Sequence, residues 1–418
     1  MEQALLWSSA FIVAHVALVA AAYTRGLFFT LIASFCVLSP LSAAVDLPFV
    51  EAAKYARFYV TILVVVIGFF HSGVKLGIAS KALLCFLLLY ATAALWSDRP
   101  IQGFAFKGLA VFAVAAGLYA GSSACDPTKL RYGLRYILCA GGVLSFLILT
   151  HLIMNPNAVS HIGRLASWGI NSNRIGQTAA PLAIVAFYFG LLDTHRRWRV
   201  VGWTVYSSLS VIVMYTGSRA SFGMLIIGSV ILAFSLSRRM VRLVFSIVAA
   251  SIVIFTALQF IDTGTGRLNE VSVDTRAADW ESAWESFKES PLVGHGWDYV
   301  LHREGGSTLN RLSIYLQIMS ETGLLGTAAF AIILVIFVTK YTSAWRRLIN
   351  HPELLNFWYL STAVTCGVLA HGLFESSVLM GSTINTVLIG ISVAMIDQLK
   401  AMADQYNYFS AQSARELL

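Results

Sequence analysis

The feature that most constrains this chain is a succession of apolar runs of about 20 residues, the length that an α-helix needs to cross the hydrocarbon core of a membrane. Of the 418 residues, 57% are hydrophobic and 12% are charged, whereas a soluble domain carries about 25% charged residues. The sequence therefore predicts an all-α polytopic membrane helix bundle of about 12 spans. The runs lie near residues 4–22, 26–44, 58–73, 77–96, 102–121, 133–154, 175–192, 200–215, 220–236, 241–260, 313–339, 355–374 and 377–397.

The basic residues predict how the bundle is oriented. The net charge is +8, but Lys and Arg gather in short clusters between apolar runs, which is the pattern of cytoplasmic loops and not of a nucleic-acid surface. We therefore expect no nucleic-acid partner. The clusters lie at residues 129–135, 195–199, 238–242 and 340–347. The loops near 155–174, 216–219, 261–312 and 375 alternate with these clusters and are expected to share the external face.

The cysteines and the N-terminus indicate no disulfide framework, metal site or signal peptide. Four of the five cysteines, Cys36, Cys85, Cys139 and Cys366, lie inside apolar runs, where a thiol behaves as a small hydrophobe. They indicate neither a disulfide framework nor a metal site. The first apolar run starts without a basic segment ahead of it, so we expect a retained first helix and not a cleaved signal peptide.

One long segment is polar and divides the chain. We predict N-terminal transmembrane helices in residues 1–260, a large external loop domain in 261–312, C-terminal transmembrane helices in 313–400 and a polar cytoplasmic tail in 401–418. Within the loop, Trp280, Trp284 and Phe287 follow the i, i+4, i+7 spacing of one helix face. This spacing predicts an amphipathic helix that lies outside the membrane.

Four arginines lie on the external side, outside the basic clusters: Arg164, Arg174, Arg219 and Arg276. An arginine at membrane depth is costly unless it has a partner or a function. The planar guanidinium binds phosphate or pyrophosphate in a bidentate manner, so these residues predict an anionic ligand. Alternatively, each arginine pairs with a loop carboxylate or extends to lipid headgroups.

Three motifs in this region carry a family resemblance. They are Thr216-Gly217-Ser218-Arg219-Ala220, then Arg276 with Trp280 and Trp284 ahead of Ser290-Pro291-Leu292-Val293-Gly294-His295-Gly296-Trp297, and then the segment from Tyr315 to Gly326. In this order they resemble the O-antigen ligase and O-antigen polymerase superfamily over residues 160–330. The segment from Arg164 to Asn173 also resembles a family signature, with Ser172 in place of the usual proline.

The resemblance implies an enzyme of the bacterial inner membrane that works in lipopolysaccharide or exopolysaccharide biosynthesis. Such an enzyme moves a glycan from an undecaprenyl-pyrophosphate donor to a sugar hydroxyl at the periplasmic face, with no metal or other cofactor. A polymerase uses a second lipid-linked repeat unit as acceptor, and a ligase uses lipid A-core. Because Leu312 and Ser313 stand where ligases carry a His-Asn pair, we expect a polymerase, with a ligase as the alternative. A transporter is a further alternative, although the charges gather at one face and not at mid-span.

The missing His-Asn pair leaves the general base open. We predict His295 and Glu321 as catalytic residues, since a base needs hydrogen-bond reach and a suitable pKa. Arg164, Arg174, Arg219 and Arg276 are the predicted pyrophosphate-binding residues. Secondary candidates are Asn173, His302, Arg303, His371 and Glu375, and Glu304 is a further possible base.

Overall fold

The computed structural model describes residues 27–43, 50–70, 75–97, 99–124, 126–155, 165, 167–235, 272–297, 313–375 and 383–416. Its elements are helices: α2 (Leu27–Leu41), α3 (Val50–Phe70), α4 (Ile78–Thr92), η1 (Ala93–Trp96), α5 (Pro100–Ser123), α6 (Pro127–Met154), η3 (Ser167–Gly169), α7 (Ser172–Leu192), α8 (Arg196–Thr216), α9 (Arg219–Ala233), α11 (Ser272–Glu289), α12 (Ile314–Leu348), α13 (Pro352–His371) and α14 (Ile384–Glu416). The prediction of an all-α fold is confirmed for these residues.

Seven of the described helices are long and apolar enough to cross a membrane. They are Ala52–Phe70, Ile78–Trp96, Pro100–Ser123, Pro127–Met154, Ser172–Leu192, Ile314–Leu348 and Ile384–Tyr406. The chain is thus a multi-pass membrane protein. The predicted total of about 12 stays a prediction, because the runs near 4–22 and 241–260 lie outside the described residues.

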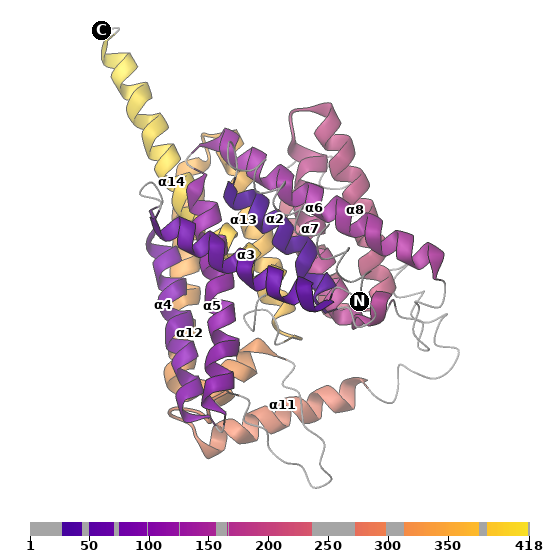
Figure 1. Cartoon of the computed structure of the whole chain (residues 1–418). Coiled ribbons are helices and arrows are strands. Elements are labelled where there is room, and N and C mark those ends of the chain that lie inside the picture. The colour runs from indigo at the N-terminus through magenta and orange to yellow at the C-terminus, as the bar shows by residue number, and fades with distance from the viewer. Residues whose placement is uncertain are drawn as a thin grey trace.

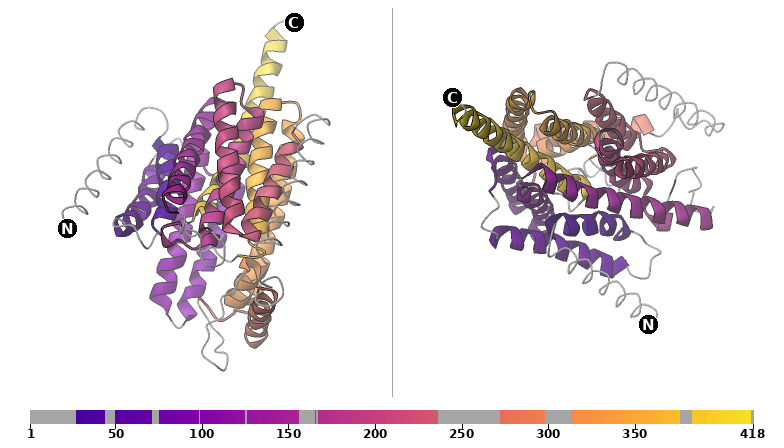
Figure 2. Two further views of the ribbon diagram at one scale, coloured as in Figure 1. Left: turned by 90° about the vertical axis from the view of Figure 1, so that its right-hand side faces the viewer. Right: turned by 90° about the horizontal axis from the view of Figure 1, so that it is seen from above.

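The helices form an elongated bundle, and α11 lies across one of its ends (Figure 1). The C-terminal part of α14 projects from the opposite end (Figure 2). We call the first of these the α11 end. The predicted domain boundary at residue 400 falls inside α14, which continues to Glu416.

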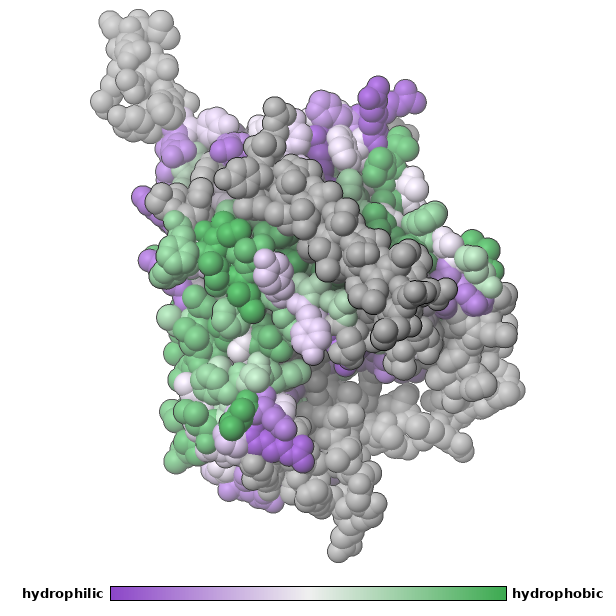
Figure 3. Space-filling view, viewed as in Figure 1, coloured by the Kyte–Doolittle hydropathy of each residue, from purple (hydrophilic) through white to green (hydrophobic). Residues whose placement is uncertain are grey.

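The lateral surface of the bundle is suited to lipid. Figure 3 shows hydrophobic residues over much of the face formed by α4 and α5, with hydrophilic residues towards the two ends. Large apolar side chains are exposed on α3, α4 and α5, among them Phe69, Phe70, Leu88, Leu89 and Phe104. A soluble protein would bury such residues, whereas hydrocarbon chains solvate them.

Small residues allow neighbouring spans to approach closely, as at the extensive contact between α5 and α14. A Cβ atom added at Gly117 would lie 2.1 Å from the carbonyl oxygen of Val387, and one at Gly390 would lie 2.5 Å from that of Val114. Because lipid tails are as apolar as the side chains, such close packing stabilises helix association in membranes more than burial does.

Three of the predicted cytoplasmic clusters meet at the end opposite α11. Arg131 of α6 pairs with Glu353 at the start of α13, at 2.6 Å. Arg347 of α12 pairs with Asp404 of α14. Arg135 pairs with Asp193, which directly precedes α8, at 3.0 Å. These contacts agree with the expectation that the clusters share one face.

At the α11 end, helix α12 is interrupted at Gly323, where φ is 60° and ψ is −154°. The segment that follows α11, residues 290–297, docks on this interruption. Four backbone hydrogen bonds join the two segments: Leu324 N to Pro291 O (2.8 Å), Leu325 N to Leu292 O (3.2 Å), His295 N to Ser320 O (3.0 Å) and Gly296 N to Glu321 O (2.9 Å). The break therefore frees backbone groups of α12 and satisfies them with the loop.

Gly294 is the position in this junction that tolerates a side chain least. Its φ is +69°, and a Cβ atom would lie 2.3 Å from the carbonyl carbon of Glu321. We expect Gly294→Ala to destabilise the fold by about 1–3 kcal/mol from backbone strain alone, measured as a lower thermal denaturation midpoint in detergent. Gly108→Ala is the matched control, because a Cβ atom there meets nothing within 4 Å. Equal midpoints for the two variants would contradict the docked geometry.

Candidate functional site

Three of the predicted site residues, Asn173, His371 and Glu375, lie at the segment that ends α13. We call residues 371–375 the α13 corner. The imidazole of His371 is buried, and its Nε2 lies 3.4 Å from Oγ of Ser221 in α9. The carbonyl oxygen of Gly372 accepts a hydrogen bond of 2.9 Å from the backbone N–H of Ile314, at the start of α12. The corner thus holds the starts of two other helices.

The same corner reaches two further elements. Oε1 of Glu375 accepts a hydrogen bond of 3.0 Å from Nδ2 of Asn173, in the first turn of α7. The ring of Phe374 lies against Trp280 of α11, with centroids 6.5 Å apart. Four elements from distant parts of the sequence, α7, α9, α11 and α12, therefore meet at one corner.

Each predicted arginine within the described residues lies on one of these elements. Arg174 follows Asn173 on α7, and Arg219 is the first residue of α9. Both side chains are exposed, and neither pairs with a carboxylate among the described residues. Arg276 lies on α11, one turn before Trp280; its side chain is outside the described residues, as are Arg164, His302, Arg303 and Glu304 as a whole.

Local sequence explains how Arg219 is placed. Gly217 has a φ of 59°, the left-handed conformation that ends α8. Ser218 then caps α9 by accepting a hydrogen bond from the backbone N–H of Ser221. A Cβ atom at Gly176 would lie 2.8 Å from Oγ of Ser221, so α7 packs directly on this turn. The turn is thus fixed on one side by α7 and on the other by His371.

A further arginine, Arg57 of α3, lies close enough to Arg174 for their charges to interact, and it is not among the arginines predicted from the sequence. Its guanidinium lies 4.6 Å from the ring centroid of Phe58. Its Nε is buried and has no hydrogen-bond partner among the described residues. The nearby charge that acts on it most is another guanidinium, that of Arg174. Two like charges at membrane depth repel each other and are costly, which favours a role in holding an anion.

Glu321 occupies a different environment from the one expected of a free base. Its carboxylate is buried and accepts hydrogen bonds from Nζ of Lys107 (2.7 Å), from Oη of Tyr90 (2.8 Å) and from Nε2 of Gln317 (2.7 Å). Nζ of Lys107 also lies 3.5 Å from the centroid of the Tyr90 ring. This network joins α4, α5 and α12 directly beneath the docked loop.

His295 closes the other side of that loop. Its Nε2 lies 2.9 Å from the carbonyl oxygen of Ser286 in α11 and 3.6 Å from Oε2 of Glu289. A carbonyl oxygen only accepts hydrogen bonds, so Nε2 carries the proton. In this state His295 anchors the end of α11, and its catalytic role stays a prediction, as does that of Glu321.

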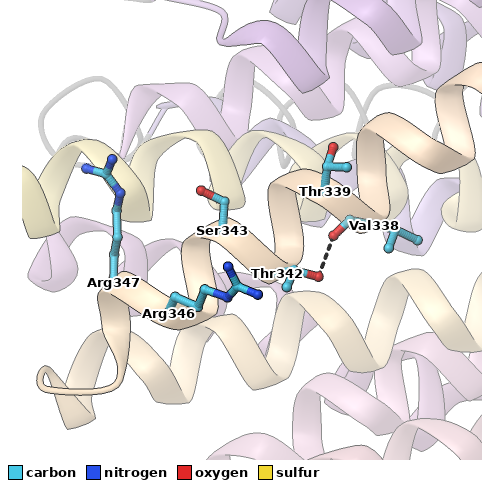
Figure 4. A pocket seen from close by; sticks show the side chains of 6 residues that line it. All are labelled: Val338, Thr339, Thr342, Ser343, Arg346 and Arg347. Carbon is cyan, nitrogen blue, oxygen red and sulfur yellow. Dashed lines mark hydrogen bonds between the residues drawn. The ribbon is translucent and has the colours of Figure 1, made fainter.

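Two further observations concern the pockets and the metal-binding groups of the described residues. A groove of about 430 Å³ is lined by Val338, Thr339, Thr342, Ser343, Arg346 and Arg347, all on α12 at the end opposite α11 (Figure 4). It lies away from the α13 corner. Among the described residues, no group of three or more His, Cys, Asp or Glu side chains has the spacing to hold a metal ion.

One known protein family matches part of the chain. Residues 204–331, which run from α8 into α12, match the family model described as O-antigen ligase. This match supports membership of the chain in the O-antigen ligase and polymerase superfamily. None of the curated proteins compared with it matches. The family indicates a membrane glycan enzyme of the ligase or polymerase type, and members of the family act on lipid-linked glycans.

The superfamily match covers the elements that carry Arg219 and Arg276, but Arg57, Lys107 and the α13 corner lie outside it. The sequence pattern around Arg57 and Lys107 could have indicated both residues. Both are single basic residues beside or inside an apolar run, and such a residue is retained when it has a partner or a function.

Proposed function

We propose that this protein transfers a glycan from an undecaprenyl-pyrophosphate donor to a sugar hydroxyl at the periplasmic face of the inner membrane. The observation that carries the proposal is a set of arginines without carboxylate partners among the described residues: Arg174 and Arg219, on helices whose first turns contact the α13 corner, and Arg57, whose charge is opposed by that of Arg174. Within the superfamily, an anionic lipid-linked substrate accounts for this unneutralised charge.

Arginines at this position supply what the reaction needs. When the glycosidic bond to the carrier breaks, negative charge builds on the departing pyrophosphate. Preorganised guanidinium groups stabilise that charge in the transition state, and each grips two phosphate oxygens at once. This source of positive charge supports transfer without a metal ion or a nucleotide. The apolar lateral surface suits the polyprenyl chain of a substrate that arrives within the bilayer.

We further propose that the acceptor is a second lipid-linked repeat unit, which makes the protein an O-antigen or exopolysaccharide polymerase. Leu312 and Ser313 stand where the ligases that this chain resembles carry a His-Asn pair. The ligase reaction, with lipid A-core as acceptor, remains the second candidate because both reactions break the same donor bond.

The test separates the two candidates. Deletion of the gene is expected to leave the surface glycan as single repeat units if the protein is a polymerase. Accumulation of long glycan that is not attached to lipid A-core would instead support the ligase. Purified protein given the lipid-pyrophosphate glycan should form new glycosidic bonds, detected as products of higher mass. Translocation without any new bond would indicate a transporter and overturn the proposal.

A further inference from the structure

We propose that His371 is the group that accepts the proton of the attacking sugar hydroxyl. This inference rests on the proposed function and assigns the general base that the proposed function leaves open. It concerns a residue of α13, outside residues 204–331 that match the family.

The position of His371 is the first argument. His371 is the first residue of the α13 corner. The start of α9, which carries Arg219, and the start of α7, which carries Arg174, both contact this five-residue segment. A base must lie within hydrogen-bond reach of the hydroxyl, which in turn lies beside the anomeric carbon next to the pyrophosphate. The corner is thus contacted by the elements that carry Arg174 and Arg219.

The hydrogen bonding of the titratable groups at the α11 end is the second argument. Three donors converge on the carboxylate of Glu321, and Nε2 of His295 is bonded to a backbone carbonyl oxygen. His371 differs from both, because its Nδ1 is buried and has no hydrogen-bond partner among the described residues. A buried polar nitrogen without a partner is costly, and it requires an explanation.

The serines of the cap can accommodate a proton on Nε2 of the imidazole. Oγ of Ser221 lies 2.9 Å from Oγ of Ser218. If Ser221 donates to Ser218, its oxygen accepts from Nε2–H of His371. The lone pair then lies on Nδ1, the nitrogen without a partner. The imidazole is held by Nε2 and presents a basic nitrogen, which is the arrangement that a general base needs.

The proposed step transfers the glycan to the acceptor oxygen and one proton to His371. The acceptor oxygen forms a bond to the anomeric carbon of the donor glycan, while its proton passes to Nδ1 of His371. The bond between the anomeric carbon and the pyrophosphate oxygen breaks, and its electron pair leaves with the lipid pyrophosphate. The imidazolium keeps its Nε2–H bond to Ser221 and releases the added proton to water after the product departs. Because Nδ1 is buried in this state, the acceptor reaches it when side chains at the corner shift.

The test uses the full-length protein in nanodiscs with an undecaprenyl-pyrophosphate-linked repeat unit. His371→Gln keeps a hydrogen-bonding side chain of similar size but accepts no proton. We expect it to lower the rate of bond formation by about 100-fold or more, with donor binding and thermal denaturation unchanged. His351→Gln, at the opposite end of the same helix, should keep the wild-type rate. The ring of His351 is tilted against that of Tyr406, with centroids 5.8 Å apart, and His351 is not part of the corner.

Chemical rescue separates a base from a packing role. Added imidazole should raise the rate of His371→Ala, whereas pyrazole, which has the same size but is far less basic, should not. Equal rescue by both, or a His371→Gln rate within about threefold of the wild type, would overturn the assignment and leave the proposed function intact. A wild-type protein that forms no bond would overturn both.

Discussion

Replacement of Arg219 by alanine is expected to lower glycan transfer by about 100- to 1,000-fold, which is the usual cost of removing one group that stabilises transition-state charge. The guanidinium is exposed at the first position of α9 and pairs with no carboxylate in the described part of the chain. Its removal therefore leaves no buried charge unpaired, and the fold should be unaffected. The measurement is bond formation by purified protein, together with the thermal denaturation midpoint.

Two variants sharpen this prediction. Arg346→Ala removes an exposed arginine from the groove at the opposite end (Figure 4) and should leave the rate unchanged. Arg219→Lys keeps the charge but not the two-pronged grip on phosphate oxygens, so we expect only partial recovery. Full activity of Arg219→Ala would refute the assignment of this arginine to the pyrophosphate.

Replacement of Lys107 by methionine is expected to have the largest effect on stability. Lys107 and Glu321 form a buried ion pair of 2.7 Å, with 3% and 1% of their side-chain surfaces exposed. Removing one partner leaves the other charge buried and unpaired, which costs about 3–5 kcal/mol. A large fall in the denaturation midpoint in detergent, with loosening of the docked loop, is the expected result.

The double variant and a surface pair provide the controls. Lys107→Met combined with Glu321→Gln removes both charges, so most of the lost stability should return. Lys288→Met breaks the exposed pair between Lys288 and Glu285 and should change stability by no more than about 1 kcal/mol. If Lys107→Met unfolds at the wild-type midpoint, the ion pair does not hold the junction together.

Part of the fold follows directly from composition. The apolar runs near 77–96, 102–121 and 133–154 correspond to the helices from α4 to α6, because hydrocarbon forces a buried backbone to satisfy its hydrogen bonds within a helix. Helix α3 begins at Val50, whereas the apolar run predicted for it begins near residue 58. The run begins later than the helix because the first turns of the helix contain polar residues. Arg57 lies in those turns, and the positions of the apolar runs therefore do not indicate it.

The glycines of the loop show the limit of pattern reading. The motif from Ser290 to Trp297 carries a family resemblance in the sequence. Only the tertiary structure shows that this segment forms backbone hydrogen bonds with α12. A Cβ atom at Gly294 would meet the backbone of Glu321 and Thr322, and one at Gly323 would meet that of Leu292 and Val293, at distances too short for a side chain. Such a constraint depends on a partner segment, and local sequence carries no record of that partner.

The sequence by itself determined the helical class, the predicted orientation and the superfamily, because apolar length, charge placement and short motifs are local properties of the chain. Only the tertiary structure decided which of the candidate residues lie together. Asn173, Ser221, Trp280 and Ile314 are far apart in sequence, and their contacts with the α13 corner arise from helix packing. The pairing of Glu321 with Lys107 was decided in the same way, since a buried charge is stabilised by whichever partner the packing brings within reach.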